Sequence, residues 1–182
     1  MNTFKTFAAL LVLSTVGTIA GCSSTPAKSP DVTDSLRKSL DQAGYKNVSV
    51  DQDRDKGVVT LGGHVADETD KAQAETIAKS IAGPQVVADQ IAVIPPGNES
   101  DAKAVNADLD KAIEKNLDAA LIENKLNRHV KYEVKNGVVT LTGDVRSEAT
   151  RGRAQTVATG VPNVQQVVNE LQVKDQKASS SN

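Results

Sequence analysis

The sequence predicts an α+β fold of two tandem copies of one small domain, each with the element order αββαβ. Residues 57–93 and 137–173 align without a gap at a constant numbering offset of 80, and 14 of the 37 aligned positions are identical. Within each copy, runs rich in β-branched residues indicate strands. Between these runs lies a helical segment with one narrow apolar stripe. We therefore predict, in each domain, a small three-stranded mixed sheet covered on one face by two helices.

The repeated block itself supplies a strand, a helix and a closing strand. Gly57 to Leu61 has the same five residues as Gly137 to Leu141, and a glycine and a valine follow in both copies. The next segment places apolar residues at positions i, i+3, i+4 and i+7, as one face of a helix requires. The block closes on apolar residues at a spacing of two, which is typical of a half-buried strand. The helix positions are Ala74, Ile77, Ala78 and Ile81, repeated as Ala154, Val157, Ala158 and Val161, and the closing positions are Val87, Asp89, Ile91 and Val93, repeated as Val167, Asn169, Leu171 and Val173.

A helix and a short strand precede each block. The first helix starts at Pro30-Asp31 and ends at Gly44, since glycine is favoured just beyond a helix C-terminus. In the second copy Asn136-Gly137 lies between two alternating runs, which is a strong hairpin signal. The second copy's first helix is longer, and its apolar stripe at spacing four winds around the helix, so its far end is free to contact something other than its own sheet. That stripe consists of Val105, Leu109, Ile113, Leu117 and Leu121.

The N-terminus predicts export and lipid anchoring. One positive charge, Lys5, precedes a short uncharged apolar run, as in a secretory signal. The run ends in Ile19-Ala20-Gly21-Cys22, which resembles the lipobox of bacterial lipoproteins, and Cys22 is the only cysteine of the chain. We therefore expect Cys22 to be acylated and to anchor the protein stably. The expected divisions are a signal (1–21), a flexible tether (22–29), domain 1 (30–95), a linker (96–104), domain 2 (105–174) and a disordered tail (175–182).

The charge is distributed unevenly between the two domains. Residues 30–97 contain 7 basic and 11 acidic residues, whereas residues 104–174 contain 10 and 9. Because anionic lipid attracts Lys and Arg, the second domain is favoured if either faces acidic headgroups. A solvated charged face is the alternative interpretation. The candidate headgroup-binding residues are Lys111, Lys115, Lys125, Arg128, Arg146, Arg151 and Arg153.

The sequence offers no convergent catalytic set. The two histidines, His64 and His129, occupy non-equivalent positions, so neither a paired metal site nor a duplicated base is expected. The acidic run 51–55 starts like a calcium loop but lacks the glycine and the glutamate that such a loop requires. Gly63 and Gly143 are interpreted as positions of tight packing under a helix. We expect no catalytic residues, no metal and no cofactor. The outer sheet faces, including Val58, Thr60 and Val138, are either solvated or form the contact between the domains.

At the repeated block the sequence resembles the BON domain of bacterial envelope proteins. The resemblance is carried by the Gly57–Leu61 strand, the continuation Leu61-x-Gly63-x-Val65, the Ala74-x-x-Ile77-Ala78 helix and the closing strand, each present twice. Asp89 departs from the asparagine usual in the closing strand. The resemblance implies the αββαβ fold, attachment to membrane phospholipid, a role in envelope integrity or osmotic stress, and no catalysis. It leads us to expect a periplasmic protein anchored to the outer membrane, with phospholipid at Cys22 and at domain 2, a possible envelope protein partner and no nucleic acid. The alternative is a protein interaction module for which the anchor only sets the location.

Overall fold

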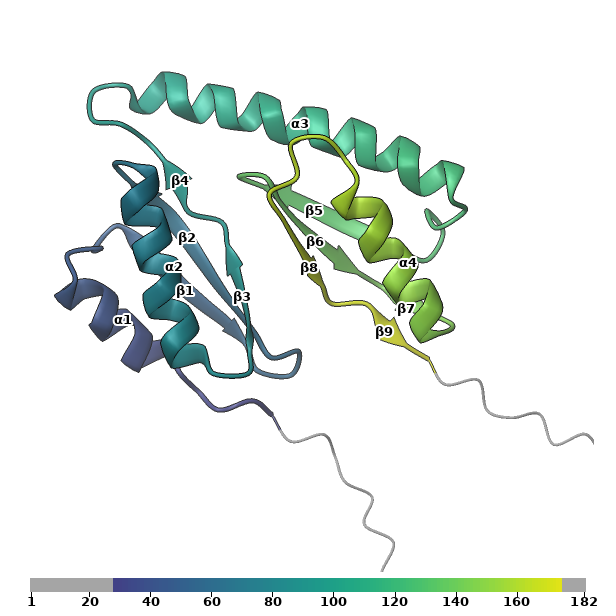
Figure 1. Ribbon diagram of the computed structural model, residues 1–182, viewed down its shortest axis with the longest axis horizontal. Coiled ribbons are helices and arrows are strands. Elements are labelled where there is room, and N and C mark those ends of the chain that lie inside the picture. The colour runs from purple at the N-terminus through teal and green to yellow at the C-terminus, as the bar shows by residue number, and fades with distance from the viewer. Residues whose placement is uncertain (1–27, 175–182) are drawn as a thin grey trace, which may run out of the picture.

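The computed structural model describes residues 28–174, which form two domains that lie side by side (Figure 1). The predicted signal, Cys22 and the predicted tail 175–182 lie outside the described residues. Both domains have the predicted order αββαβ, with the last strand in two short pieces and, in domain 2, the second strand divided as well. Domain 1 contains α1 (Thr33–Gln42), β1 (Val48–Asp53), β2 (Val58–Val65), α2 (Glu68–Ala82), β3 (Val86–Asp89) and β4 (Ala92–Val93). Domain 2 contains α3 (Glu99–Glu123), β5 (Lys131–Lys135), β6 (Val138–Thr142), β7 (Asp144–Val145), α4 (Glu148–Thr159), β8 (Gln166–Asn169) and β9 (Gln172–Val173).

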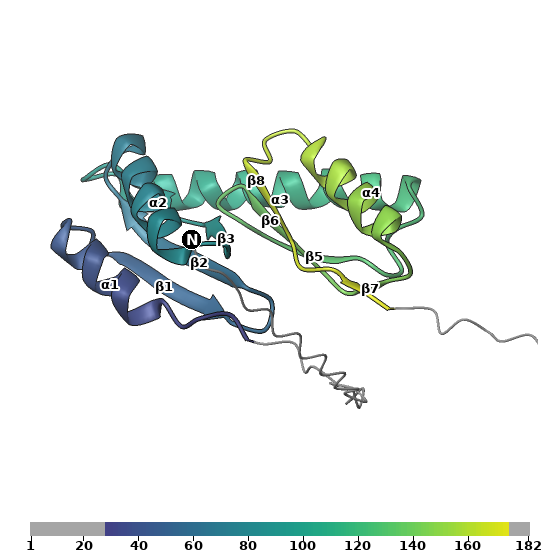
Figure 2. The ribbon, with the colours of Figure 1, turned by 60° about the horizontal axis from the view of Figure 1, so that its bottom comes forward.

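The sheets are mixed, as predicted. In domain 1, β1 runs antiparallel to β2, and β3 and β4 run parallel to β2 in one register. Domain 2 repeats this arrangement with β5 antiparallel to β6 and with β8 and β9 parallel to β6 and β7. In Figure 2, α1 and α2 lie over the same face of the first sheet. The parallel pairs need the crossover that α2 and α4 supply, since a hairpin can join only antiparallel strands.

Each domain has its own aliphatic core between sheet and helices. Most of the largest fully buried side chains come from the first helix and the second strand of each domain, and Ile91 lies between the two pieces of the closing strand of domain 1. Burying a leucine side chain contributes about 1.5–3 kcal/mol, so a few such residues account for much of the stability of so small a unit. In domain 1 they include Leu36, Leu40, Val59, Leu61 and Ile91, and in domain 2 Ile113, Leu117, Leu121, Val139 and Leu141.

The closing strand divides at the same position in both domains. The Asp89 side chain accepts a hydrogen bond from the backbone N–H of Ile91 at 3.1 Å, and Asn169 accepts one from Leu171 at 3.2 Å. An Asp or Asn side chain that bonds the backbone two residues later turns the chain locally. The alternation of the closing residues therefore continues through a kink that separates β3 from β4 and β8 from β9.

Gly63 and Gly143 allow two strands of the same sheet to approach closely, so their assignment to packing under a helix is wrong. A Cβ added at Gly63 would overlap the carbonyl oxygen of Asn47, and one added at Gly143 would overlap that of His129. Both glycines have positive φ, +85° and +119°. Glycine is therefore required at these two positions because the backbone leading into β1 or β5 of the same domain passes close by.

The long helix α3 begins inside the segment predicted as the linker. Residues 99–104 are helical, so the connection after β4 is shorter than predicted. The apolar stripe of α3 is buried at Ile113 but exposed at Val105 and Leu109, which are 57% and 44% accessible. The first half of α3 therefore extends beyond the core of its own domain, as the winding stripe allowed.

Equivalent residues of the two repeats meet at the domain interface. Val58 and Ala88 of domain 1 pack with Val138 and Val168 of domain 2, and each pair is related by the offset of 80. Such a self-complementary contact is the arrangement found across a two-fold axis. Of the two options left open for the outer sheet faces, the structure shows the interdomain contact at Val58 and Val138.

Polar contacts follow the same pseudo-symmetry. Lys56 Nζ lies 2.6 Å from a carboxylate oxygen of Glu170, and the equivalent Asn136 donates its side-chain N–H to the carbonyl of Gln90 at 2.7 Å. The hydrogen bond to Glu170 raises the pKa of Lys56. Gln166 also bridges the free edge of β3, because its amide donates to the Val87 carbonyl at 2.7 Å and accepts from the Asp89 N–H at 3.0 Å. These contacts hold the two sheets in a defined relation.

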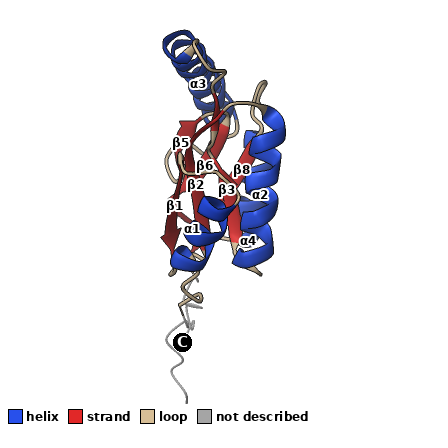
Figure 3. Ribbon diagram, turned by 90° about the vertical axis from the view of Figure 1, so that its left-hand side faces the viewer, coloured by secondary structure: helices blue, strands red, loops and turns tan. Residues whose placement is uncertain are grey.

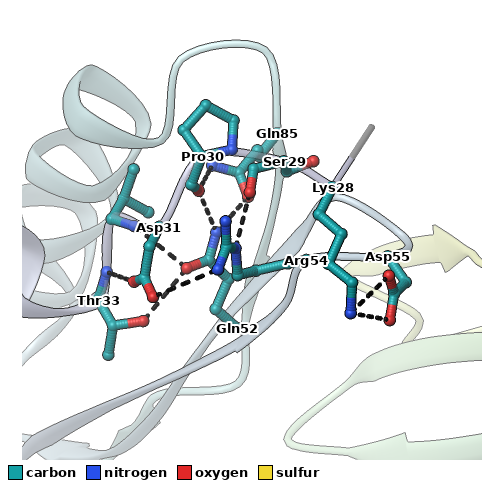
Figure 4. A network of polar contacts seen from close by, with 10 residues as sticks. Lys28, Ser29, Pro30, Asp31, Thr33, Gln52, Arg54, Asp55 and Gln85 are labelled. Carbon is teal, nitrogen blue, oxygen red and sulfur yellow. Dashed lines mark hydrogen bonds and ion pairs between the residues drawn. The ribbon is translucent and has the colours of Figure 1, made fainter. Parts of the chain in front are cut away.

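The last residues of the predicted tether are bound to the turn between β1 and β2 (Figure 4). Ser29 donates its N–H to the carbonyl of Arg54 at 2.9 Å, and Arg54 Nε donates back to the carbonyl of Ser29 at 2.8 Å. Gln52 donates to the carbonyl of Pro30 at 2.7 Å, and Lys28 pairs with Asp55 at 3.1 Å. The chain thus enters domain 1 along this turn.

Candidate functional site

Four of the seven candidate basic residues gather at one end of domain 2, where α3 ends and α4 begins. Arg153, in the middle of α4, donates to the side-chain oxygen of Asn124 at 3.2 Å, which ties α4 to the end of α3. The loop after α3 passes His129, whose carbonyl lies against Gly143 just before the β7–α4 connection. We name this group the basic end; it consists of Lys125, Arg128, Arg146 and Arg153, all of them exposed.

Lys125 is positioned by the way in which α3 terminates. It has φ of +57°, a left-handed conformation that usually requires glycine at this place beyond a helix. Its N–H bonds the carbonyl of Ile122 at 3.0 Å, and the next N–H, that of Leu126, bonds the carbonyl of Leu121 at 2.8 Å. A lysine here costs on the order of 1 kcal/mol of backbone strain. The left-handed conformation closes the last turn of α3 and leaves the Lys125 side chain exposed.

The other three candidate residues lie apart from the basic end. Lys111 and Lys115 lie near the middle of α3, and the 14 residues from Lys111 to Lys125 correspond to roughly 21 Å of helix. Lys111 also pairs with Asp108 at 3.4 Å. Arg151 faces the sheet, because it donates to the Asn169 carbonyl at 3.2 Å and pairs with Glu148 at 3.6 Å. Arg151 therefore connects α4 to β8, and one headgroup cannot contact all seven residues.

Acidic groups near the basic end are largely paired with other bases. Asp144 pairs with Lys174 at 2.7 Å, and Glu148 lies beside Arg151. Glu123, on the last turn of α3, is the acidic neighbour in sequence of Lys125. The basic end is therefore a positive surface on a domain that has 10 basic and 9 acidic residues in total between positions 104 and 174.

The described residues show no arrangement typical of an active site. Between residues 28 and 174, no three His, Cys, Asp or Glu side chains lie close enough together to hold a metal ion. Over the same range, none of the helices combines the length and apolarity needed to cross a membrane. One buried carboxylate stands out, since burial raises the pKa of Asp89 near Lys71, Glu75 and Lys79. It lies on β3 at the domain interface and has no nucleophile or histidine among these neighbours.

A comparison with protein families agrees with the duplication. The profile of the BON domain matches residues 29–95 and 109–175. The chain is 32% identical over 137 residues to the Osmotically-inducible protein Y of Escherichia coli (strain K12), covering 74% of this chain and 67% of that protein. Among solved structures, CdsD, a structural protein of the Type III secretion system of Chlamydia trachomatis, is 15% identical with a TM-score of 0.35 over 78% of this chain and 91% of that chain. The C-terminal domain of CdsD gives a TM-score of 0.33 at 15% identity, over 79% and 98%.

Proposed function

Because the chain belongs to the BON domain family, we propose that it is a lipid-anchored periplasmic protein that binds anionic phospholipid and supports the envelope under osmotic stress. The observation that carries the lipid-binding half of the proposal is the basic end of domain 2. Induction by osmotic conditions is stated in the name of the related Escherichia coli protein and supports the physiological half. The protein acts by binding and has no catalytic role in this proposal.

The energetics of the basic end suit a membrane surface. Each Lys or Arg close to an anionic bilayer gains about 1 kcal/mol, and the attraction falls off within a Debye length of about 10 Å at 0.1 M salt. All four residues of the basic end are exposed, three of them in the loops after α3 and before α4 and Arg153 in the middle of α4, so together they supply a few kcal/mol. This is weak binding alone. It becomes effective when an anchor keeps the domain near the bilayer.

The proposed anchor is Cys22. Lys28 follows it by six positions, so the lipid and the clamped start of domain 1 lie within about 20 Å of each other. Because Ser29 is hydrogen-bonded to Arg54 of the β1–β2 turn and Pro30 to Gln52 near the end of β1, this end of domain 1 faces the bilayer in the anchored protein.

Charge reversal at the basic end is expected to reduce vesicle binding strongly. The mature chain 22–182 carrying Cys22→Ser is mixed with vesicles of phosphatidylethanolamine and phosphatidylglycerol (3:1) at low salt and separated by flotation. Lys125→Glu with Arg128→Glu should weaken binding by about 30-fold or more, because two attractions of about 1 kcal/mol are lost. The matched control reverses the exposed Lys38 and Lys46 of domain 1, and should change binding less than threefold.

Two outcomes of the flotation experiment would reject the lipid-binding proposal. The first is that the unaltered domains fail to float with anionic vesicles at low salt. The second is that both double variants lose binding equally, since general electrostatics and not the basic end would then be responsible.

Acylation is tested separately in cells. We expect mass spectrometry of the N-terminal peptide to show an acylated Cys22, and we expect the protein in the membrane fraction. The Cys22→Ser protein should move to the soluble periplasmic fraction. An unmodified Cys22 in the mature protein would refute the anchor without bearing on the basic end.

A further inference from the structure

The first half of α3, residues 99–112, presents an apolar surface that its own domain does not cover. Val105 and Leu109 are one helical turn apart and both are exposed, whereas Ile113, which continues the same stripe, is 1% accessible. The helix runs along one side of both domains (Figures 1 and 3). Two large apolar side chains in line on a solvent-facing helix suit contact with another molecule.

A groove between the domains continues this surface. Its volume is about 540 Å³, and its apolar wall includes Ile91, Pro95, Leu109, Ile113 and Val164. The groove draws its residues from α2, β4, α3, the β5–β6 turn and the loop before β8, so it exists only when the two domains are packed together. It is large enough to take several side chains of a bound peptide.

The walls of the groove are held in place by hydrogen bonds. Asp110 of α3 accepts the backbone N–H groups of Asn136 and Gly137 at 2.8 Å and 2.9 Å. The side chain of Asn136 in turn donates to the Gln90 carbonyl of domain 1. The α3 wall is thereby fixed to both domains, and a ligand would meet a preformed surface.

The charge of this surface selects a basic partner. Residues 99–112 contain four acidic residues and two basic ones, and Lys111 is paired with Asp108. Glu99 and Asp101 are exposed at the start of the helix. An acidic rim around apolar residues repels an anionic bilayer and attracts a positively charged peptide.

The position of α3 also favours a protein over the anchoring membrane. The chain start is clamped at the β1–β2 turn, while α3 begins after β4, which pairs with the opposite end of β2. The eight residues of β2 separate these ends by about 26 Å. In the anchored protein the first half of α3 therefore faces away from the bilayer; this step alone rests on the proposed function.

We propose that the first half of α3 and the adjoining groove bind a basic, apolar peptide segment of another protein. Val105 and Leu109 supply the apolar contact, Glu99 and Asp101 attract the positive charges, and Asp110 keeps the wall in place. The basic end lies beyond the C-terminus of α3, whereas this acidic, apolar surface lies on the first half of the helix. One molecule can thus contact lipid and a partner at once.

The test measures fluorescence anisotropy of a labelled 15-residue Leu/Lys amphipathic peptide with the mature chain 22–182 carrying Cys22→Ser. Val105→Gln with Leu109→Gln should weaken binding at least tenfold without a change in charge. Ile122→Gln is the matched control, because Ile122 is 53% accessible on the far half of the same helix, and it should change binding less than twofold. A Leu/Glu peptide of the same length should bind at least tenfold more weakly than the Leu/Lys peptide.

Three results would overturn the proposal: no binding of the Leu/Lys peptide, equal binding by all variants, or equal binding of both peptides. Vesicle flotation separates this proposal from lipid binding. The Val105→Gln, Leu109→Gln variant should float as the parent does. If it loses flotation while the Lys125→Glu, Arg128→Glu variant keeps it, the surface binds membrane and both assignments are wrong.

Discussion

Gly143→Ala is expected to destabilise domain 2 by about 3 kcal/mol or more, through steric overlap combined with backbone strain. The new Cβ would overlap the carbonyl oxygen of His129, which belongs to the backbone entering β5 and cannot rotate away. The φ of +119° adds the cost of a backbone conformation that residues with a side chain rarely adopt. The equivalent Gly63→Ala should have a similar effect in domain 1, because its Cβ would overlap the Asn47 carbonyl. Urea unfolding followed by circular dichroism measures both.

Gly152→Ala is the control and should have the opposite sign. Gly152 lies inside α4 and is exposed, and a Cβ added there would have no neighbouring atom within 4 Å. Alanine in a helix interior is about 1 kcal/mol better than glycine. Both variants replace a glycine of domain 2 by alanine. Gly152→Ala should raise the midpoint of urea unfolding, and Gly143→Ala should lower it. A loss at Gly143 no larger than that of an ordinary surface substitution, about 0.5 kcal/mol, would show that the two strands can separate without penalty.

The sequence was sufficient to predict the fold because the same pattern occurs twice. The prediction of a strand at Gly57–Leu61 would be ambiguous for one copy. It is secure here because the same five residues occur again in the second repeat and are followed by the same helical pattern. Local chemistry also predicted the β5–β6 hairpin correctly, since Asn136 and Gly137 adopt φ of +48° and +76°, as a type I′ turn requires. These features depend on residues near one another in the chain.

Features that depend on contacts between distant parts of the chain were harder to predict from the sequence. The sequence marked Gly63 and Gly143 as special, but the chain that packs against them lies on a neighbouring strand and not in a helix above. The outer position of Val58 was clear, whereas its contact with Val138 depends on how the domains pair. The offset of 80 makes Lys56 equivalent to Asn136 and Gln90 equivalent to Glu170, yet it does not show that these positions meet across the interface.

The candidate site illustrates the same limit. Seven basic residues of domain 2 were predicted as candidates from the sequence, which shows only how close they are along the chain. Helix length separates Lys111 from Lys125, and the fold turns Arg151 towards β8. The left-handed conformation of Lys125 carries no sequence signal, since a glycine would ordinarily mark such a position.

Asp89→Asn is expected to stabilise the protein at neutral pH by about 1–2 kcal/mol, because it removes a desolvated charge. Burial raises the pKa of Asp89 above its ordinary value, and the carboxylate of Glu75 adds to this, while Lys71 and Lys79 act in the opposite direction. The repeat shows how an amide is accommodated here. Asn169 keeps the bond from Leu171 and donates to the Arg151 carbonyl and to Gln155, each at 3.2 Å. An asparagine at position 89 would add donors to the equivalent groups on α2.

The pH dependence of this gain identifies its cause. Because the folded-state pKa of Asp89 is raised, the folded protein binds the proton more tightly than the unfolded chain, and stability falls as pH rises through that window. The gain from Asp89→Asn should therefore vanish below about pH 4, the ordinary range of an aspartate, and be complete above the raised pKa. Asp51→Asn, at an exposed position of β1, is the control and should change stability by less than about 0.5 kcal/mol. If Asp89→Asn increased the stability equally at pH 3 and pH 7, the buried charge could not be the cause. The gain would then come from the packing of the asparagine.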